Sequence, residues 1–151
     1  MVEDVNPNAV VATTAAADAA QGKEAAWVAY VLHAFGYVTA MMWPAIIGVV
    51  VNYVKRRDAV ARHHDWMIRT FWYGLFWYLL SLAALLWSAW PLVHAAWLGA
   101  VSGEFMLAWS AVFQMIGAAT LGAFGFLVTW LWLLYRVIRG MVRLAESKPV
   151  P

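Results

Sequence analysis

Long apolar runs separated by short polar segments dominate the hydrophobic pattern of this chain. Three such runs cover residues 25–54, 71–93 and 105–135. An α-helix needs roughly 20 residues to cross the hydrocarbon core of a bilayer, and each run reaches that length. The pattern therefore predicts an all-α integral membrane protein whose transmembrane domain, residues 25–135, contains three transmembrane helices.

The polar segments complete the predicted organisation. Residues 1–24 lack a sustained apolar pattern, and we expect a loose N-terminal tail there. From Val60 to Phe71 an apolar residue or histidine recurs every three or four positions, which predicts an interfacial helix leading into the second span. Residues 136–151 form a basic tail whose arginines also follow helical spacing, as expected for a helix on the membrane surface.

Composition supports the bilayer as the solvent of this chain. Hydrophobic residues make up 65% and charged residues 12% of the 151 positions, whereas soluble domains have roughly 45–50% apolar residues. The net charge of +2 could suggest a nucleic-acid partner, but the basic residues flank apolar runs, so a membrane anchor is the better interpretation and no nucleic-acid partner is predicted. The absence of cysteine excludes disulfides and thiolate chemistry.

The distribution of basic residues predicts an orientation. The first loop and the C-terminal tail carry nine of the ten Lys and Arg residues, and three spans place both on one side of the membrane. By the positive-inside rule that side is the cytoplasm, so the N-terminal tail, with Lys23, is expected outside. Eight of these basic residues are candidate lipid contacts: Lys55, Arg56, Arg57, Arg62, Arg69, Arg136, Arg139 and Arg143.

Three segments carry a resemblance to a known family. Residues 49–56 read V-V-V-N-Y-V-K-R, residues 63–72 read H-H-D-W-M-I-R-T-F-W, and residues 134–149 read L-Y-R-V-I-R-G-M-V-R-L-A-E-S-K-P. This order resembles a family of small, uncharacterised three-span bacterial inner-membrane proteins. The resemblance covers about a third of the chain and implies a three-span fold in the bacterial inner membrane, with the N-terminus in the periplasm. It implies no activity.

The chain departs from the family pattern at three positions. Met67 stands where the family usually has Gln, Ala145 where it has Asn, and Ser147 where it has Gly. The first change removes a polar side chain from the cytoplasmic edge of the second span.

Small and polar residues recur along single faces of the predicted spans. In the first span they occur every fourth position from Gly36 to Asn52, with Pro44 in the middle, where we expect a kink. A helix face made of small residues lets another helix approach closely in a membrane. The candidate helix-packing residues are Gly36, Ala40, Gly48, Asn52, Gly74, Ser81, Gln114, Ala118 and Gly122.

Candidate chemistry is limited to histidines. His33, inside the first span, and His94, at the outer end of the second, could approach each other near Glu104 and ligate a cofactor. The alternative is that both only form hydrogen bonds at the interface. No metal site is predicted.

The favoured function is therefore non-enzymatic. Neither a nucleophile–base pair nor a carboxylate pair is evident in the sequence, and we expect no enzyme. We expect an accessory or assembly subunit that packs against a larger membrane complex or against a second copy of itself. The alternatives are a redox or cofactor-binding subunit that holds haem, quinone or pigment through His33 and His94, and, less well supported because no internal repeat is evident, a small oligomeric transporter.

Overall fold

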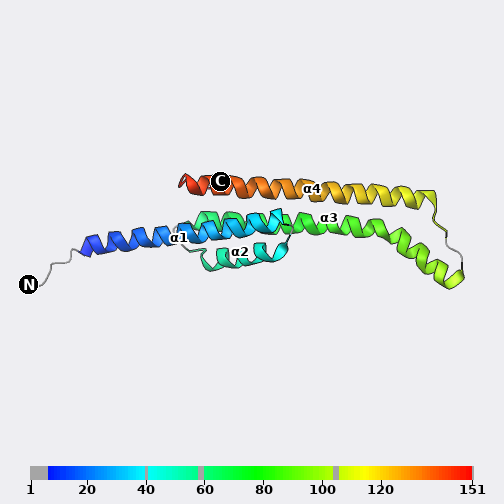
Figure 1. Ribbon diagram of the computed structural model, residues 1–151, viewed down its shortest axis with the longest axis horizontal. Coiled ribbons are helices and arrows are strands. Elements are labelled where there is room, and N and C mark those ends of the chain that lie inside the picture. The colour runs from blue at the N-terminus through cyan, green and yellow to red at the C-terminus, as the bar shows by residue number, and fades with distance from the viewer. Residues whose placement is uncertain (1–6, 40, 58–59, 104–105, 151) are drawn as a thin grey trace, which may run out of the picture. The chain divides into compact units, whose positions relative to one another are not determined.

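The computed structural model describes residues 7–39, 41–57, 60–103 and 106–150, and within these ranges it contains four α-helices and no strand (Figure 1). The helices are α1 (Pro7–Val38), α2 (Met42–Val54), α3 (Ala61–Ser102) and α4 (Trp109–Ala145). The predicted all-α class is confirmed. The chain divides into two compact units, which we call the basic unit (residues 1–72 and 133–151) and the apolar unit (residues 73–132).

The first apolar run is two helices rather than one. A single kinked span at residues 25–54 was predicted, and this prediction is wrong, because α1 ends at Val38 and α2 begins at Met42. Pro44 lies in the first turn of α2, where a missing N–H costs nothing because the first four N–H groups of a helix have no intrahelical partner. The proline therefore starts a helix instead of kinking one.

The two helices form an antiparallel hairpin held by close contacts at glycines. A Cβ placed on Gly36 would lie 3.0 Å from the backbone nitrogen of Ala45, and one placed on Gly48 would lie 2.6 Å from Cε1 of His33. Later residues of α2 therefore contact earlier residues of α1, so the two helices run antiparallel. Figure 1 shows them side by side. Small residues allow this approach because no side chain keeps the backbones apart.

The other helices extend beyond their predicted bounds. Helix α1 begins at Pro7, so residues 7–24 are helical where a loose tail was predicted. Helix α3 begins at Ala61 and passes through Pro91 to Ser102, so the predicted interfacial helix and the second span are one continuous element. Its end is marked by Gly103, whose φ of 78° is readily adopted by glycine and whose N–H bonds the carbonyl of Gly99 at 2.9 Å.

Helix α4 ends in a Schellman motif. The N–H of Lys148 bonds the carbonyl of Arg143 at 2.8 Å, and the N–H of Ser147 bonds that of Leu144 at 3.1 Å. Ser147 has a φ of 54°, which is the left-handed conformation that this motif requires. Glycine adopts this conformation at the least cost, so glycine would suit position 147 better than serine.

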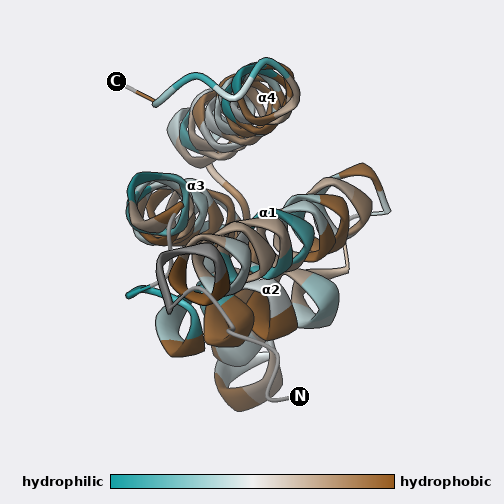
Figure 2. Ribbon diagram, turned by 90° about the vertical axis from the view of Figure 1, so that its left-hand side faces the viewer, coloured by the Kyte–Doolittle hydropathy of each residue, from teal (hydrophilic) through white to brown (hydrophobic). Residues whose placement is uncertain are grey.

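Charge separates the two units. All ten Lys and Arg residues belong to the basic unit, and the apolar unit has none. Inside the apolar unit, α3 and α4 pack at Gly122, where a Cβ would lie 2.6 Å from Cγ of Leu85, and the Tyr78 and Phe126 rings meet edge-to-face at 4.5 Å. Figure 2 shows hydrophilic colour on the C-terminal segment and on parts of α1 and α3, while α2 is mostly hydrophobic.

Two helices of the described chain are long and apolar enough to cross a membrane, namely α3 and α4. Only 6% of the most apolar 18-residue window of each helix is buried within the protein. The core helix of a soluble protein would be mostly buried, so this exposure is compatible with membrane association. Helix α2, with 13 residues, is shorter than the roughly 20 that a crossing needs.

Candidate functional site in the basic unit

Buried polar side chains gather where α1, α2 and the first turns of α3 meet. The apolar cluster of the basic unit includes Ala26, Tyr30, Met67, Val137 and Leu144. Met67 is 1% exposed and belongs to this cluster, so its thioether fits the position better than a buried, charged or strongly polar group would. The buried side chains with polar groups on α1, on α2 and on α3 before Phe71 include Tyr30, His33, Asn52, His63, His64 and Thr70.

A chain of two hydrogen bonds joins α1, α3 and the C-terminal tail. His63 Nε2 lies 3.1 Å from the carbonyl oxygen of Lys148, and His63 Nδ1 lies 3.1 Å from the hydroxyl of Tyr30. A carbonyl only accepts, so Nε2 carries the proton, and Nδ1 then accepts from the tyrosine O–H. Gly140 of α4 leaves room for the Tyr30 ring, because a Cβ there would meet Cε1 and Cζ at 2.5 and 2.6 Å.

His63 precedes the predicted span at residues 71–93, and its environment favours the neutral imidazole. Burial lowers the pKa of His63, while the hydrogen bond to the Lys148 carbonyl acts in the opposite direction. The neutral ring is the form that can accept from Tyr30 and donate to Lys148 at once.

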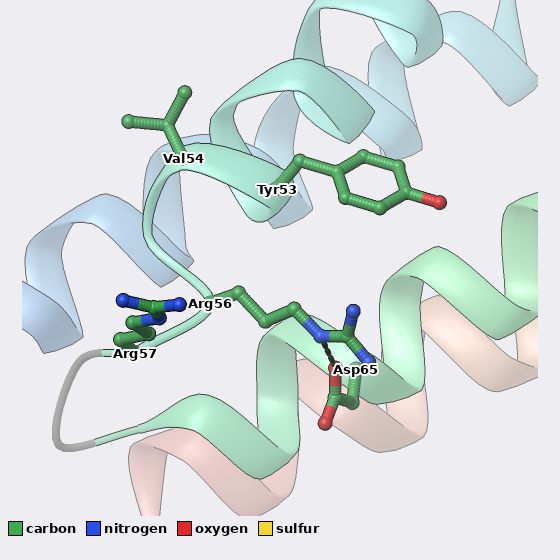
Figure 3. A pocket seen from close by; sticks show the side chains of 5 residues that line it. All are labelled: Tyr53, Val54, Arg56, Arg57 and Asp65. Carbon is green, nitrogen blue, oxygen red and sulfur yellow. Dashed lines mark hydrogen bonds and ion pairs between the residues drawn. The ribbon is translucent and has the colours of Figure 1, made fainter.

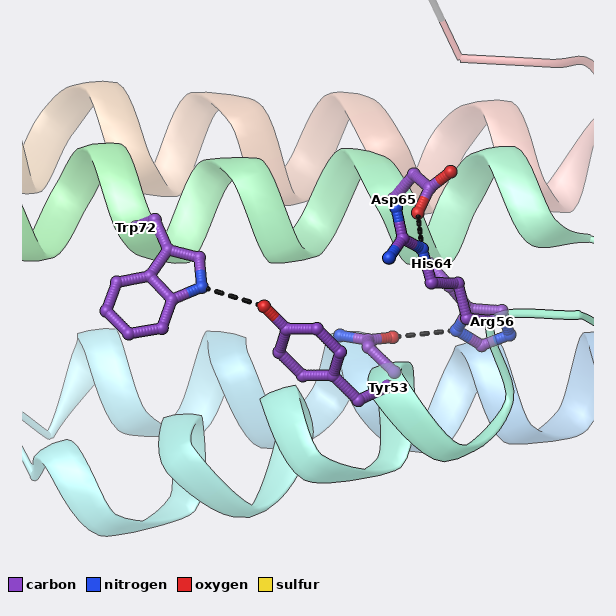
Figure 4. Close-up of polar contacts among 6 residues, drawn as sticks. Tyr53, Arg56, His64, Asp65 and Trp72 are labelled. Carbon is purple, nitrogen blue, oxygen red and sulfur yellow. Dashed lines mark hydrogen bonds and ion pairs between the residues drawn. The ribbon is translucent and has the colours of Figure 1, made fainter.

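A second polar pair links α2 to α3. His64 Nδ1 lies 2.8 Å from Oδ1 of Asn52 (Figure 4). Both side chains are fully buried. The amide oxygen accepts, so His64 donates from Nδ1. Within the described part of the chain, Nδ2 of Asn52 has no hydrogen-bond partner. The predicted packing residue Asn52 therefore binds within its own chain.

His33 is held in one tautomer. Its Nδ1 lies 2.8 Å from the carbonyl oxygen of Ala29, so Nδ1 carries the proton and Nε2 carries the lone pair. Nε2 is buried without a hydrogen-bond partner among the described residues. The ring meets Tyr37 and Phe71 edge-on, at centroid distances of 5.9 and 6.3 Å.

The second histidine of the predicted cofactor pair lies in the other unit. His94 is exposed in the apolar unit, 6.5 Å from the Trp90 ring, whereas His33 is buried in the basic unit. Glu104, the carboxylate predicted beside them, lies outside the described residues. Across the described ranges, no three His, Cys, Asp or Glu side chains are grouped as a metal site would need.

The arginines of α4 contact the protein itself. The Arg136 guanidinium lies 3.6 Å from the centre of the Trp66 ring and donates from Nε to Thr70 at 2.8 Å. Arg139 donates to the Tyr135 hydroxyl at 2.9 Å. Arg143 donates to the carbonyl of Pro149, also at 2.8 Å. These three predicted lipid contacts thus also fix the end of α4 and the tail.

Two further basic residues, Arg56 and Arg57, line an open pocket between the end of α2 and the start of α3. The pocket has a volume of about 660 Å³ and is lined by Tyr53, Val54, Arg56, Arg57 and Asp65 (Figure 3). Arg56 donates from Nε to Oδ1 of Asp65 at 2.6 Å, and Trp72 donates from Nε1 to the Tyr53 hydroxyl at 3.1 Å (Figure 4). Arg62 and Arg69 are exposed on α3, and Lys55 is half-buried.

The predicted packing residues fall into three groups. Ala118 is half-buried and Gln114 is exposed, both on α4, while Ala40 lies outside the described residues. The others are buried: Gly36, Gly48, Asn52, Gly74, Ser81 and Gly122. Where their contacts are defined, as at Gly36, Gly48 and Gly122, the neighbours belong to this same chain.

Sequence reasoning missed the Tyr30–His63–Lys148 chain and the role of Asp65. His63 and His64 are adjacent, but the His63 ring contacts Tyr30 of α1 and the His64 ring contacts Asn52 of α2. The sequence around the two histidines does not identify these partners. The available signal was a pair of histidines beside an apolar run. Burying a histidine without a hydrogen-bond partner is costly, so partners could have been expected.

Comparison with known proteins finds no matching family model, no similar curated protein and no similar solved structure.

Proposed function

We propose that this protein is a non-enzymatic accessory or assembly subunit of a bacterial inner-membrane complex. The apolar unit crosses the bilayer as a two-helix hairpin, and the exposed face of α4 docks a helix of the complex. Support for the membrane placement comes from the apolar unit, which has no Lys or Arg and whose spans are long enough for a core of roughly 30 Å.

The observation that carries this proposal is the exposed side chain of Gln114 beside an open glycine. Gln114 lies on α4, and a Cβ placed on Gly117, three residues later, would meet nothing within 4 Å. An amide facing lipid has no hydrogen-bond partner, whereas an amide facing another helix gains one, for about 1–2 kcal/mol. Gly117 would let that helix approach closely.

The open face of α4 differs from the contact face predicted from the sequence. Gly48 and Gly122 were expected to touch a partner, but each is occupied by a side chain of this chain, His33 and Leu85 respectively. Gly117 and Gln114 remain open on α4. The docking face is therefore the part of α4 that carries Gln114 and Gly117.

The membrane topology that fits these contacts has two crossings. Helices α1 and α2 form a re-entrant hairpin on the side of the basic tail, since α2 is too short to cross and the hairpin exposes apolar side chains such as Phe35 and Ile47. Three spans with a periplasmic N-terminus is the competing topology. The positive-inside rule assigns the basic segments at residues 55–69 and 136–148 to the cytoplasmic side in both.

The test is purification of the full-length protein in a mild detergent, followed by mass spectrometry of intact complexes. We expect a defined stoichiometric complex with another membrane protein or with a second copy. A monomer that carries only lipid, at every detergent concentration, would contradict the proposal.

A second function is favoured by one observation, the buried lone pair of His33. An imidazole that donates from Nδ1 to a backbone carbonyl and leaves Nε2 open has the arrangement of a metal- or haem-binding histidine. A visible absorption band of the purified protein that His33→Ala removes would establish this cofactor function. A colourless wild-type protein after reconstitution with haem would exclude haem as the ligand.

A further inference from the structure

Helix α2 has one continuous exposed apolar stripe. Trp43, Ile47, Val50 and Val54 recur at spacings of four, three and four, and each is between 46% and 74% exposed. The opposite face, which includes Gly48 and Asn52, is buried. At a rise of 1.5 Å per residue the stripe is about 16 Å long. This length is close to half of the roughly 30 Å hydrocarbon core, which is the depth of one leaflet.

The stripe ends at the pocket of Figure 3. Val54 is both the last residue of the stripe and a lining residue of the pocket, whose other walls are Tyr53, Arg56, Arg57 and Asp65. The lining carries two positive charges and one negative charge. Its net charge of +1 therefore complements the single negative charge of a phosphodiester.

One donor of the pocket, Arg56, is oriented for an acceptor. Asp65 binds Nε of Arg56, which orients that guanidinium and leaves its terminal amino groups available for a second acceptor. Figure 3 shows Arg56 reaching toward Asp65 and Arg57 leaving the same turn in another direction. Arg57 is exposed and, among the contacts defined for the described residues, is not held by an ion pair, so it can turn toward a bound anion.

Tyr53 adds a third donor. Its oxygen accepts a hydrogen bond from Nε1 of Trp72, at 3.1 Å, so the hydroxyl proton points elsewhere and can be donated. Tyrosine and tryptophan side chains with an apolar body and a polar tip favour the headgroup level of a membrane. The pair therefore marks a depth at which phosphate groups are found.

We propose that this pocket binds the phosphate of an anionic glycerophospholipid, such as phosphatidylglycerol, with one acyl chain lying along the stripe from Trp43 to Val54. Arg56, Arg57 and Tyr53 donate to the phosphate, and α2 covers the chain. The inference rests on the membrane placement of the proposed function but not on the docking face at Gln114. Inorganic phosphate shares the headgroup chemistry but cannot use the stripe.

The test is a lipid titration of the purified full-length protein in a mild detergent, with bound lipid counted by native mass spectrometry. We expect one retained phosphatidylglycerol per chain, weaker retention of phosphatidylcholine, and no displacement of the lipid by an equal concentration of inorganic phosphate. Arg57→Gln should lower the lipid affinity by at least about tenfold, because a charge-assisted contact is lost. Val50→Ser should also weaken binding, since it interrupts the stripe.

Arg62→Gln is the matched control. Arg62 is exposed on the first turn of α3 and does not line the pocket, so this variant removes the same charge nearby. We expect an affinity within about twofold of wild type. Equal losses for Arg57→Gln and Arg62→Gln would overturn the proposal in favour of unspecific attraction by the basic surface. Displacement by inorganic phosphate, or equal retention of phosphatidylcholine, would also overturn it.

Failure of this inference is separable from failure of the proposed function. The Arg57→Gln variant leaves Gln114 and Gly117 untouched, so it should keep any protein partner while losing the lipid. Loss of both together would show that the lipid effect is indirect.

Discussion

Lys23 donates a hydrogen bond from Nζ to Oγ of Ser147 at 3.1 Å, although 124 positions of sequence separate the two residues. The charge pattern had predicted them on opposite sides of the membrane, one in the N-terminal tail and the other in the C-terminal tail. The Tyr30–His63–Lys148 chain joins the same two parts of the protein. Both contacts favour a hairpin of α1 and α2 beside the basic tail over a first span that crosses the bilayer.

Labelling of single cysteines tests this topology. The chain has no cysteine, so Gln21→Cys and Ala145→Cys each introduce a unique thiol at an exposed position. We expect a membrane-impermeant thiol reagent to label both from the same side of sealed inverted vesicles. Labelling of the two thiols from opposite sides would contradict the hairpin and support three spans.

The contact between Gly140 and Tyr30 predicts a large cost for a small side chain. Gly140→Ala places a methyl group against the Tyr30 ring in a packed core, and we expect a loss of about 1–3 kcal/mol of stability. Thermal unfolding in detergent measures it.

Gly117→Ala is the control for that change, because it makes the same replacement on the same helix in open space. It should leave the stability unchanged or raise it by up to about 1 kcal/mol, through the higher helix propensity of alanine. Equal melting temperatures for the two variants would contradict the packing of α1 on α4.

The left-handed conformation of Ser147 predicts that glycine is the better residue there. Ser147→Gly should strengthen the end of α4 by about 0.5–1 kcal/mol, because the strain of a side chain at φ of 54° exceeds the value of one exposed hydrogen bond to Lys23. Hydrogen exchange of the amides at residues 147 and 148 should slow about two- to fivefold.

Ser147→Ala separates the two contributions, since it removes the hydroxyl but keeps the Cβ. Hydrogen exchange of the amides at residues 147 and 148 in this variant should be as fast as in the wild type or faster. A similar slowing in both variants would show that backbone strain is not the cause.

Hydrophobic runs predicted the helical class and the two longest apolar helices, because uninterrupted apolar sequence of this length has few other solutions. The break between Val38 and Met42 could not be predicted in the same way. Pro44 is compatible with a kink inside one helix and with the first turn of a new one. The choice depends on tertiary contacts, above all the fit of His33 against Gly48.

The polar cluster depended on long-range contacts for the same reason. Tyr30 and His63 are 33 positions apart, and His63 and Lys148 are 85 apart, so no local spacing identifies them as partners. The basic residues near Arg56 were recognised from charge alone, but the pocket requires Asp65 and Tyr53, whose roles follow from the turn between α2 and α3. The sequence therefore indicated which types of residue form the polar cluster and the pocket, but not how these residues are arranged in space.

The most direct test of the docking face compares Gly117→Leu with Ala123→Leu in native mass spectrometry of the purified complex. Both positions are exposed on α4, and their separation of six residues places them about 120° apart around the helix. Neither should prevent membrane insertion. We expect Gly117→Leu to lose the partner or second copy and Ala123→Leu to retain it. Retention by both variants, or loss in both, would contradict a docking face at Gln114 and Gly117.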